Sequence, residues 1–374
     1  MTSNLDADPP PRVLHLLFEL TLSGAERMLA SAANELAAAG STIVATSPNV
    51  GRFAGDLAAA GYRIVHCPFA RSLRHFIDIA KILRAGSFDV VHIHLEQARI
   101  WYLLLARLLG LPAVATIHAE FRFDGALRRR KAVGRRLAAL FGVRFVACSE
   151  RVARNERARF GTTPAVIANW TDPARLVTTD GARDRLRSSL RLSPDTFVTV
   201  SIANEAPIKN LAALVRAVAM QGPGHIHLHL GQVSPELACL VAELASGRLL
   251  LLGEVEAIGP YLAASDAFLC TSFAEGGPLV LIEAALAGLP CVTTDVGVVE
   301  EFGSMPAMVI VEPDPSAISA GIDRVRAMTP AERRRQGAEL ATFAGRRYVP
   351  AVGGRHYAAL YRALSHRHGL RTPA

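Results

Sequence analysis

Two glutamates, Glu275 and Glu283, bound the segment of this sequence that is most able to do chemistry. The residues between them are only glycine, proline and aliphatic, in the order GGPLVLI. A helix through this run and the alanines after it would be apolar on every face, so Glu283 should lie in the interior. A buried carboxylate is costly unless it is paired or hydrogen-bonded. We therefore expect Glu283 to hold something polar: two hydroxyls of a ribose, an internal cation or the N–H groups of a loop.

Lys209 is the second candidate, because it closes the loop NEAPIK and opens the helical run NLAALVRAVAM. A lysine beside a helix N-terminus faces the positive end of the dipole, which is unfavourable unless an anion binds between them. A phosphate would reconcile the two charges, whereas a side chain pointing into solvent is the plain alternative. Gly276 and Gly277 leave backbone amides bare enough for phosphate or sugar hydroxyls to approach, with Glu275 at the mouth of the same site.

The elements that must position these residues are short apolar strands alternating with helical stretches. Near-continuous apolar runs are typical of strands buried on both faces, as in a parallel sheet covered by helices. They occur at 12–19, 41–47, 88–94, 112–118 and 144–149, and again at 196–203, 225–231, 248–253, 267–272 and 290–295. The polar stretch 171–185 separates the two sets. The pattern predicts two doubly wound α/β domains, 1–175 and 176–349.

Polar residues follow many of these strands. In open α/β sheets ligands bind outside the carboxyl ends of the strands, and two such sheets could direct their loops into one interdomain cleft. The residues that fall at strand ends are the SGAE loop, His92, His94, His118, Ser149, Asn169, and the loops NEAPIK and SFAEGG. A ligand site in such a cleft is therefore expected.

The formal charge of +8 is unevenly distributed. Residues 1–175 hold 23 basic and 14 acidic residues, and the rest of the chain holds 18 and 19. The densest cations are Arg128, Arg129, Arg130, Lys131, Arg135 and Arg136, spaced to cover much of a helix surface. An ordinary solvated face and a patch for anionic lipid headgroups are both open interpretations. Nucleic acid is disfavoured, because no aromatic residues interleave with the cations.

Several features indicate a cytoplasmic protein. The apolar stretch 100–114 contains Arg107, Gly110 and Pro112 and is shorter than the ~20 residues that span a bilayer. The N-terminus has no basic start leading into an apolar core, as a secretory signal would. The five cysteines are scattered, which favours reduced thiols over a disulfide or zinc framework. His225, His227 and His229 alternate along one strand, and we interpret them as sheet-surface residues because no carboxylate or cysteine accompanies them.

The segment SFAEGGPLVLIEAALAGLPCVTTDVGVVEE resembles the signature of retaining nucleotide-sugar glycosyltransferases of family 4, which have the GT-B fold. Glu275 and Glu283 stand where that family has its two glutamates. The resemblance covers nearly the whole chain. It includes LTLSGAERMLASAANELAAAG, DVVHIH, ATIH, VACSE, VIANWTDPARL, IKN, LLGEVEAIGPYLAASDAFLCTS and YAALY. A closing helix at about 350–374 that packs back on the first domain is implied as well.

The resemblance implies a role for each matching residue. Glu275 would hold hydroxyls of the donor sugar, and Glu283 would hold the ribose. Lys209 would neutralise the leaving diphosphate, and His118 would border the reacting sugar. The remaining donor contacts would come from the amides of Gly276, Gly277 and Leu279, the backbone of Gly24, and Asn204.

The chain departs from the family pattern at three places. Family members usually carry an arginine a few residues before the lysine, where this loop has Asn204, Glu205 and Ala206. One cation fewer would weaken stabilisation of the leaving group. Gly277 replaces a bulkier residue, so the sugar specificity of the family cannot be transferred. In the first loop, Ser23 stands where a second glycine is usual.

The sequence-based prediction is a GT-B enzyme that moves a hexose-type sugar from a nucleoside diphosphate to an acceptor hydroxyl, with retention and without a covalent enzyme residue. The leaving phosphate would take the acceptor proton. No acidic metal cluster of the Asp-x-Asp type stands beside the residues singled out, so no metal or other cofactor is expected. The acceptor would be a saccharide or lipid-linked, as in polysaccharide or glycolipid assembly at the inner membrane face. Two alternatives are an inactive nucleotide-sugar-binding subunit and a nucleotide-sugar epimerase. A nicotinamide oxidoreductase is disfavoured, because no Gly-x-Gly-x-x-Gly follows the first strand of either half.

Overall fold

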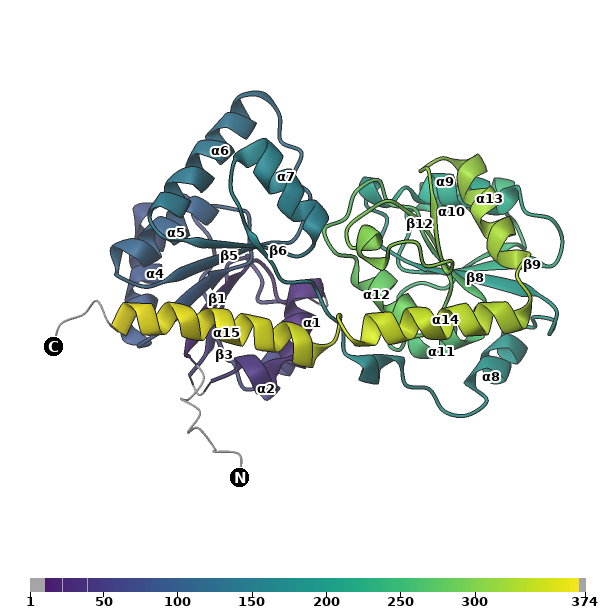
Figure 1. Ribbon diagram of the computed structural model, residues 1–374, viewed down its shortest axis with the longest axis horizontal. Coiled ribbons are helices and arrows are strands. Elements are labelled where there is room, and N and C mark those ends of the chain that lie inside the picture. Colours follow the sequence, from purple (N-terminus) through teal and green to yellow (C-terminus); the bar gives the residue numbers. More distant parts are fainter. Residues whose placement is uncertain (1–10, 22, 39, 370–374) are drawn as a thin grey trace. The chain divides into compact units, whose positions relative to one another are not determined.

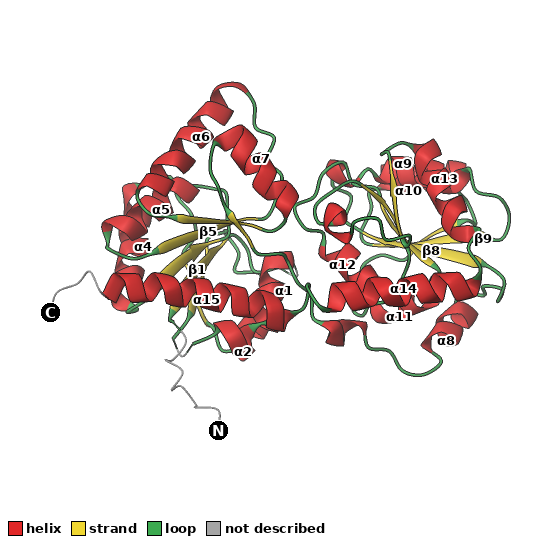
Figure 2. Ribbon diagram, in the orientation of Figure 1, coloured by secondary structure: helices red, strands yellow, loops and turns green. Residues whose placement is uncertain are grey.

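The computed structural model describes residues 11–21, 23–38 and 40–369, and the chain divides into two compact units (Figure 1). Unit 1 is residues 1–169 together with 350–374, and unit 2 is residues 170–349. In each unit a parallel sheet lies between helices (Figure 2). The predicted pair of Rossmann-like α/β domains is therefore present.

Unit 1 contains a seven-stranded sheet in the order β3-β2-β1-β4-β5-β6-β7, with parallel pairing throughout. Its strands are β1 Val13–Leu17, β2 Thr42–Ala45, β3 Arg63–His66, β4 Val90–Ile93, β5 Ala113–Ile117, β6 Arg144–Ala147 and β7 Ala165–Val166. Its helices are α1 Gly24–Ser31, α2 Ala33–Leu36, α3 Ala54–Ala59, α4 Leu73–Ala85, α5 Arg99–Leu108, α6 Gly125–Leu140, α7 Glu150–Phe160 and α15 Pro350–Gly369. Every residue of β1, β2, β4 and β5 is buried, as expected for strands covered on both faces.

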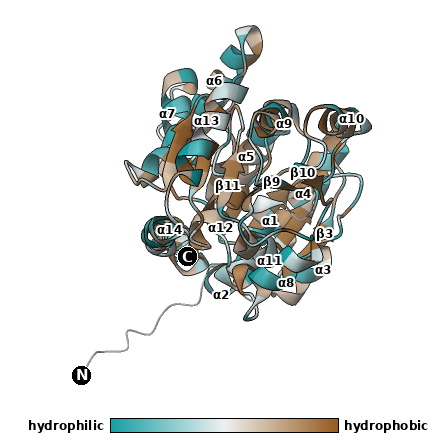
Figure 3. Ribbon diagram, turned by 90° about the vertical axis from the view of Figure 1, so that its right-hand side faces the viewer, coloured by the Kyte–Doolittle hydropathy of each residue, from teal (hydrophilic) through white to brown (hydrophobic). Residues whose placement is uncertain are grey.

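Unit 2 contains a six-stranded parallel sheet in the order β10-β9-β8-β11-β12-β13. Its strands are β8 Phe197–Ile202, β9 His225–Leu230, β10 Leu249–Leu251, β11 Ala267–Cys270, β12 Cys291–Thr294 and β13 Met308–Val311. Its helices are α8 Ala182–Ser189, α9 Leu211–Ala219, α10 Pro235–Leu244, α11 Gly259–Ala264, α12 Leu279–Leu286, α13 Pro315–Arg326 and α14 Pro330–Gly345, with 3-10 turns η1 Pro173–Leu176, η2 Pro207–Lys209 and η3 Val299–Phe302. Coloured by hydropathy, the central strands are mainly brown, whereas teal residues lie on the helices around them (Figure 3).

The strand order reverses at one point in each sheet. In unit 1 the chain moves outward from β1 to β2 and β3 and then resumes on the other side at β4, and in unit 2 the same reversal separates β8 from β11. The loops after the two strands at such a point diverge to opposite faces and leave a crevice at the carboxyl edge of the sheet. Ligand-binding residues are therefore expected after β1 and β4, and after β8 and β11.

The boundary between the units falls at 169/170, whereas the sequence places it at 175/176. The intervening residues pack with unit 2, because Thr171 and Arg175 both contact the buried Glu283. The final helix, α15, belongs to unit 1. A side chain at Gly354 would lie 3.0 Å from Glu35 of α2, so α15 approaches α2 closely. Residues 370–374 of the expected closing helix lie outside the described residues.

Candidate active site

The loops after β8 and β11 bring an ammonium group and a carboxylate together at the switch point of unit 2. Lys209 Nζ lies 2.5 Å from Glu275 Oε1. The Ser272 hydroxyl donates to the same oxygen at 2.9 Å. Lys209 and Glu275 keep 22% and 16% of their side-chain surface exposed, so both can be reached by a ligand. The sequence singled out both residues, and the structure pairs them.

Hydrogen bonds to the backbone carbonyls of Ile208 and Lys209 fix the two loops to each other. The Thr271 hydroxyl donates to the Lys209 carbonyl at 3.0 Å, and the Phe273 N–H donates to the Ile208 carbonyl at 2.8 Å. Ile208 and Phe273 are 44% and 51% exposed, which gives the edge of the Lys209–Glu275 pair an apolar border. Sequence reasoning missed Phe273, although it lies within the signature segment, because no spacing distinguishes this aromatic residue from a core residue.

The Gly276–Gly277 turn is buried and is backed by a third glycine. A side chain at Gly297, whose φ is +55°, would place its Cβ 2.6 Å from Pro278 Cδ and 3.1 Å from the Gly276 carbonyl oxygen. Only glycine allows this approach. Helix α12 begins at Leu279, with Pro278 as its N-cap, and Gly288 at φ +72° follows its end. The positive end of the α12 dipole therefore lies directly after the turn.

Glu283 is buried, with 1% of its surface exposed. Its Oε1 accepts a hydrogen bond from the Thr171 hydroxyl at 3.0 Å and forms an ion pair with Arg175. Of the three interpretations offered for Glu283, the internal cation is thus present in the structure. The ribose role stays a prediction, because a nucleoside would have to share or replace these partners. Arg175 was not predicted; its only sequence signal is a cation shortly before the second domain.

The loop after β8 contributes Lys209 as its only cation. Asn204 is exposed two residues beyond β8. Glu205, in the loop where the family resemblance led us to expect an arginine, accepts hydrogen bonds from the backbone and hydroxyl of Ser234, the N-cap of α10. The one Asp-x-Asp pair of the sequence, Asp6 and Asp8, lies outside the described residues.

In unit 1, Gly24 is the first residue of α1, just after the loop that leaves β1. Ser23 caps this helix in an extended conformation, and its hydroxyl bonds to the Glu26 carboxylate. Glu26 is 4% exposed, and burial raises its pKa. Leu22 of the predicted loop lies outside the described residues.

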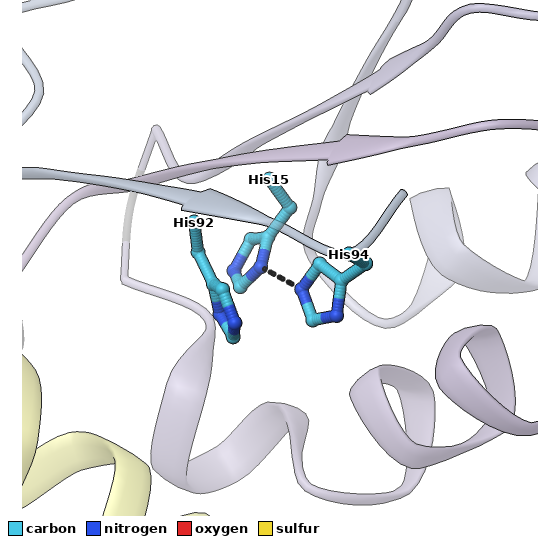
Figure 4. Close-up of side chains that lie close together, drawn as sticks. All are labelled: His15, His92 and His94. Atoms are coloured by element: carbon cyan, nitrogen blue, oxygen red, sulfur yellow. Dashed lines mark hydrogen bonds between the residues drawn. The ribbon is translucent and has the colours of Figure 1, made fainter. Parts of the chain in front are cut away.

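His118 follows β5 and belongs to a cluster of histidines on one face of the unit 1 sheet. His15 of β1 is the register partner of His92 on β4, and His94 lies just beyond β4 (Figure 4). His118 Nε2 lies 3.2 Å from His94 Nδ1, and His94 Nε2 lies 3.1 Å from His15 Nδ1. The sequence indicated His92, His94 and His118 but missed His15, which only the parallel register brings beside them.

Helix α15 closes the buried side of this cluster. The Tyr361 hydroxyl lies 2.6 Å from His92 Nδ1, and Thr116 Oγ1 lies 2.7 Å from His92 Nε2. The Tyr357 hydroxyl lies 2.8 Å from the same threonine oxygen. Burial lowers the pKa of His92 well below its usual value, so the ring is neutral at physiological pH.

The interpretation of His225, His227 and His229 as surface residues is wrong. All three are at most 2% exposed. They form a hydrogen-bonded ladder with β8, in which Thr199 Oγ1 bridges His225 and His227 at 2.9 and 2.8 Å, and Ser201 Oγ bridges His227 and His229 at 2.9 and 2.8 Å. β8 was predicted as a near-continuous apolar run, so the hydroxyl groups of Thr199 and Ser201, which make this burial possible, were not recognised.

The expectation that the cations from Arg128 to Arg136 all lie on a helix surface is also wrong for Arg135. Its guanidinium is 4% exposed and pairs with Glu156 at 2.9 Å and Glu96 at 3.4 Å. Lys131 pairs with Glu96 at 2.8 Å. A buried ion-pair network therefore occupies the inner face of α6. The exposed cations of the helix are Arg128, Arg129, Arg130 and Arg136.

Both units match known protein families. Residues 22–175 match the family model Glycosyltransferase Family 4, and residues 194–327 match the model Glycosyl transferases group 1. The chain is 25% identical over 253 residues to UDP-Gal:alpha-D-GlcNAc-diphosphoundecaprenol alpha-1,3-galactosyltransferase of Escherichia coli, covering 60% of this chain and 62% of that protein. It is also 25% identical over 313 residues to EpsF of Bacillus subtilis (strain 168), covering 76% and 79%. The chain thus spans less than two thirds of the length of the E. coli relative.

Solved structures share the fold. A glycosyltransferase from Rickettsia africae superposes with a TM-score of 0.81 at 14% identity, covering 95% of this chain and 98% of the other. HepE of Anabaena, solved in complex with UDP, superposes with a TM-score of 0.80 at 19% identity, covering 94% and 100%. Among the described residues, no helix has the length and apolar character that crossing a bilayer requires. With both of its halves matched and its fold shared, the chain belongs to the family 4 glycosyltransferases of GT-B type.

Proposed function

We propose that this protein is a retaining glycosyltransferase that moves a hexose-type sugar from a nucleoside diphosphate to an acceptor hydroxyl. The observation that carries the proposal is the Lys209–Glu275 pair at the carboxyl edge of the unit 2 switch point. A charged pair at that edge suits a ligand with an anionic and a hydroxyl-bearing part, as a nucleotide sugar has.

Binding of such a donor would replace one set of contacts by another of the same kind. Lys209 would move from the Glu275 carboxylate to the diphosphate, while Glu275 would accept hydrogen bonds from sugar hydroxyls. The amides of Gly276, Gly277 and Leu279 and the α12 dipole would add to the positive field. Because negative charge grows on the diphosphate as the sugar bond breaks, this field stabilises the transition state most. The leaving phosphate would then take the acceptor proton, with no metal required.

The names of the similar proteins support a choice of first substrates. The E. coli relative transfers galactose from UDP-Gal to a sugar on diphosphoundecaprenol, and HepE was solved with UDP and with UDP-glucose. We therefore infer a UDP-hexose donor and a saccharide or lipid-linked acceptor for this chain. Sugar assembly on a membrane lipid would be consistent with a cytoplasmic location.

The test is nucleotide release from a panel of UDP-, GDP- and ADP-sugars, with and without membrane extract and with EDTA present. Release with one donor that depends on the extract, together with an α-linked product from an α-linked donor, is the expected result. Tight nucleotide binding without turnover of any donor would instead favour an inactive binding subunit, in keeping with the single cation of the 203–209 loop. Interconversion of the free nucleotide sugar without acceptor would favour an epimerase.

We also propose that unit 1 docks on an anionic membrane surface through the outer face of α6. Four arginines, Arg128, Arg129, Arg130 and Arg136, are exposed on this helix beside Val133, Leu137 and Leu140, which are 56%, 45% and 82% exposed. Phe141 is 57% exposed, and its carbonyl accepts a hydrogen bond from Arg107 at the end of α5, where Leu108 is 84% exposed. Cations mixed with large exposed apolar side chains are typical of an interfacial membrane surface.

Sedimentation with vesicles of anionic and of purely zwitterionic lipid tests this surface. Replacing Arg129, Arg130 and Arg136 by glutamate should release the protein from the anionic vesicles, since each basic residue contributes about 1 kcal/mol near such a surface. The matched control reverses three exposed arginines of unit 2, Arg324, Arg334 and Arg346, and should sediment as the unaltered protein does. Equal sedimentation of both variants would leave α6 as a solvated face.

A further inference from the structure

Three imidazole rings form a continuous chain from the core of unit 1 to the carboxyl edge of its sheet. This row of rings runs from His118 through His94 to His15, with N–N distances of 3.2 and 3.1 Å. His15 is fully buried, and its Nε2 has no hydrogen-bond partner among the described residues. His118 is half-buried, and the structure shows no partner for its Nδ1 within the described chain. The two outer nitrogens of the chain are therefore the buried Nε2 of His15 and the Nδ1 of His118 at the sheet edge.

A metal ion fits this cluster poorly, although ring nitrogens of His15, His92 and His94 lie within 4.8 Å of one another (Figure 4). Both nitrogens of His92 already have hydroxyl partners, at 2.6 and 2.7 Å. The group contains no carboxylate or thiolate to balance a divalent ion. Burial is the main cause of the lowered pKa of His92 and of His94, and the nearby guanidinium of Arg99 lowers both further, so a second cation at these rings would be unfavourable. Hydrogen bonding between neutral rings explains the arrangement better.

The state of each ring follows from its burial. Desolvation lowers the pKa of His15 to about 3 and of His118 to about 4, and it lowers the pKa of His94 well below its usual value. Near neutral pH each ring therefore carries a single N–H, which makes one nitrogen a donor and the other an acceptor. Each of the two N–N hydrogen bonds needs one donor and one acceptor.

These conditions allow only two arrangements. If His118 donates from Nε2 to His94, then His94 donates from Nε2 to His15, and all three rings carry the proton on Nε2. If His15 donates from Nδ1 to His94, then all three rings carry it on Nδ1. We infer that His118, His94 and His15 share one tautomer, so that the buried His15 determines which nitrogen of His118 is protonated.

The orphan nitrogen of His15 selects between the two arrangements. The shared Nε2 tautomer would place an N–H in the core with no acceptor, and orphaned buried N–H groups are rare because they forfeit a whole hydrogen bond. The shared Nδ1 tautomer leaves only a lone pair there. His118 then presents an Nδ1–H at the carboxyl edge of the sheet, as a hydrogen-bond donor to an oxygen of the ligand.

The role of His118 toward the substrate rests on the proposed function, whereas the tautomer of the three rings can be measured without it. A His118 that is already protonated on its outward nitrogen cannot act as a general base there. It can hold a sugar hydroxyl or phosphate oxygen in place. His94 and His15 are then positioning residues for His118 and do not touch the substrate.

The experiment is ¹⁵N NMR of the full chain labelled at histidine, recorded near neutral pH without ligand, because ring-nitrogen shifts distinguish the two tautomers. Variants of single histidines assign the three rings. We expect all three to carry the proton on Nδ1. Mixed tautomers among the three, a shared Nε2 tautomer, or a stoichiometric Zn²⁺ complex that perturbs all three rings would each overturn the inference.

Variants test whether His15 controls His118 at a distance. His15→Phe removes the Nδ1–H that donates to His94 while keeping a ring, so the His118 signal should change toward the Nε2 tautomer. In His15→Asn the side-chain amide can take the place of the Nδ1–H, so the Nδ1 tautomer of His118 should return. His92→Asn is the matched control from the same cluster, and should lower the melting temperature without moving the His118 shifts. An unmoved His118 tautomer in folded His15→Phe would contradict the inference.

Kinetics add a second readout if the enzyme is active. In His15→Phe we expect kcat to fall roughly tenfold or more while UDP affinity is unchanged, because misplacing one aligned hydrogen bond affects the reacting geometry. Inactivity of the unaltered protein would refute the proposed function yet leave the tautomer measurement decisive.

Discussion

At the scale of single residues, Lys209 and Glu275 form a partly exposed ion pair, and such pairs add only about 0–1 kcal/mol to folding stability. Their placement at a sheet switch point is therefore better explained by ligand binding than by stability. The placement of Glu283 does not point to ligand binding in the same way, because this carboxylate is buried and already has a cation and a hydroxyl as partners.

Lys209→Ala should lower kcat by roughly 10²–10³-fold, the range for loss of one group that stabilises transition-state charge. Donor affinity should change much less, because the loss is felt mainly as the diphosphate departs. The measurement is steady-state kinetics beside binding of the donor. Lys81→Ala, which removes an exposed lysine paired with Asp78 in unit 1, is the control and should retain full activity.

Glu283→Gln should weaken nucleotide binding by roughly 1–3 kcal/mol, the range for a charged hydrogen bond, measured by calorimetry with UDP and GDP. Arg175→Met separates the two roles of this carboxylate. If Glu283 only pairs with Arg175, both variants should lose stability and keep nucleotide affinity. If Glu283 also holds the ribose, only Glu283→Gln should lose affinity.

Much of this residue set could be read from the sequence, since Lys209, Glu275 and Glu283 stand at recognisable places relative to glycines and predicted helices. The partners could not. Arg175 reaches Glu283 across 108 positions of the chain, and His15 reaches His94 across 79. Such contacts depend on strand order and register, which local pattern does not encode.

At the scale of elements, the turn before α12 depends on Gly297, a glycine near the end of the signature segment that follows β12 in the chain. Gly297→Ala would push its Cβ into Pro278 and the Gly276 carbonyl, and would also strain a positive φ. We expect at least roughly a tenfold loss of kcat/KM, as for a displaced catalytic group, measured with the donor that the unaltered protein uses.

Gly303→Ala provides the matched control, because Gly303 also has a positive φ of +59° but a side chain there would meet nothing within 4 Å. With a ψ of −137° this glycine lies outside the left-handed helical region, so the cost should be limited to roughly 1–3 kcal/mol of local backbone strain, seen as a lower melting temperature. Equal losses of activity in the two variants would show that backbone strain, rather than displacement of the turn, is responsible.

The strands that the sequence predicted are the inner ones and β10, whereas β3, β7 and β13 were missed. All three are edge strands, and β7 is only 2 residues long. β3 and β7 carry no apolar run of a strand's length, so periodicity gives little signal for them. β13 is different, because its four residues are all apolar and it was overlooked despite that run. The helix that returns to unit 1 was anticipated through the resemblance alone.

At the scale of the whole molecule, five of the histidines whose burial the structure describes are at most 2% exposed and form two clusters: His15, His92, His225, His227 and His229. Burial lowers the pKa of His15 to about 3, and lowers the pKa of His225 and of His229 to about 4. It lowers the pKa of His92 and of His227 well below 6.5. Both units thus keep neutral histidines in their interiors.

These shifts predict acid unfolding. The unfolded chain takes up the protons near pH 6.5 and the folded chain does not, so the contribution of these histidines is present above that pH and is lost as pH falls toward 4. Below its unfolded-state pKa, each buried histidine lowers the free energy of unfolding by up to about 1.4 kcal/mol per pH unit. Five such histidines would remove a typical stability of about 5–15 kcal/mol within roughly one to two pH units. Circular dichroism should show a transition near about pH 5. Retained structure at about pH 4 would show that the clusters relax to accept protons.

Unit 2 is one uninterrupted stretch of chain, whereas unit 1 needs residues from both ends of the protein. Until Tyr357 and Tyr361 have been synthesised, Thr116 and His92 lack the hydroxyl groups that meet them in the finished protein. On the ribosome the later half should therefore finish folding before the earlier half, reversing the usual N-terminal-first order. A nascent chain stalled before Pro350 would expose an incomplete first half to chaperones.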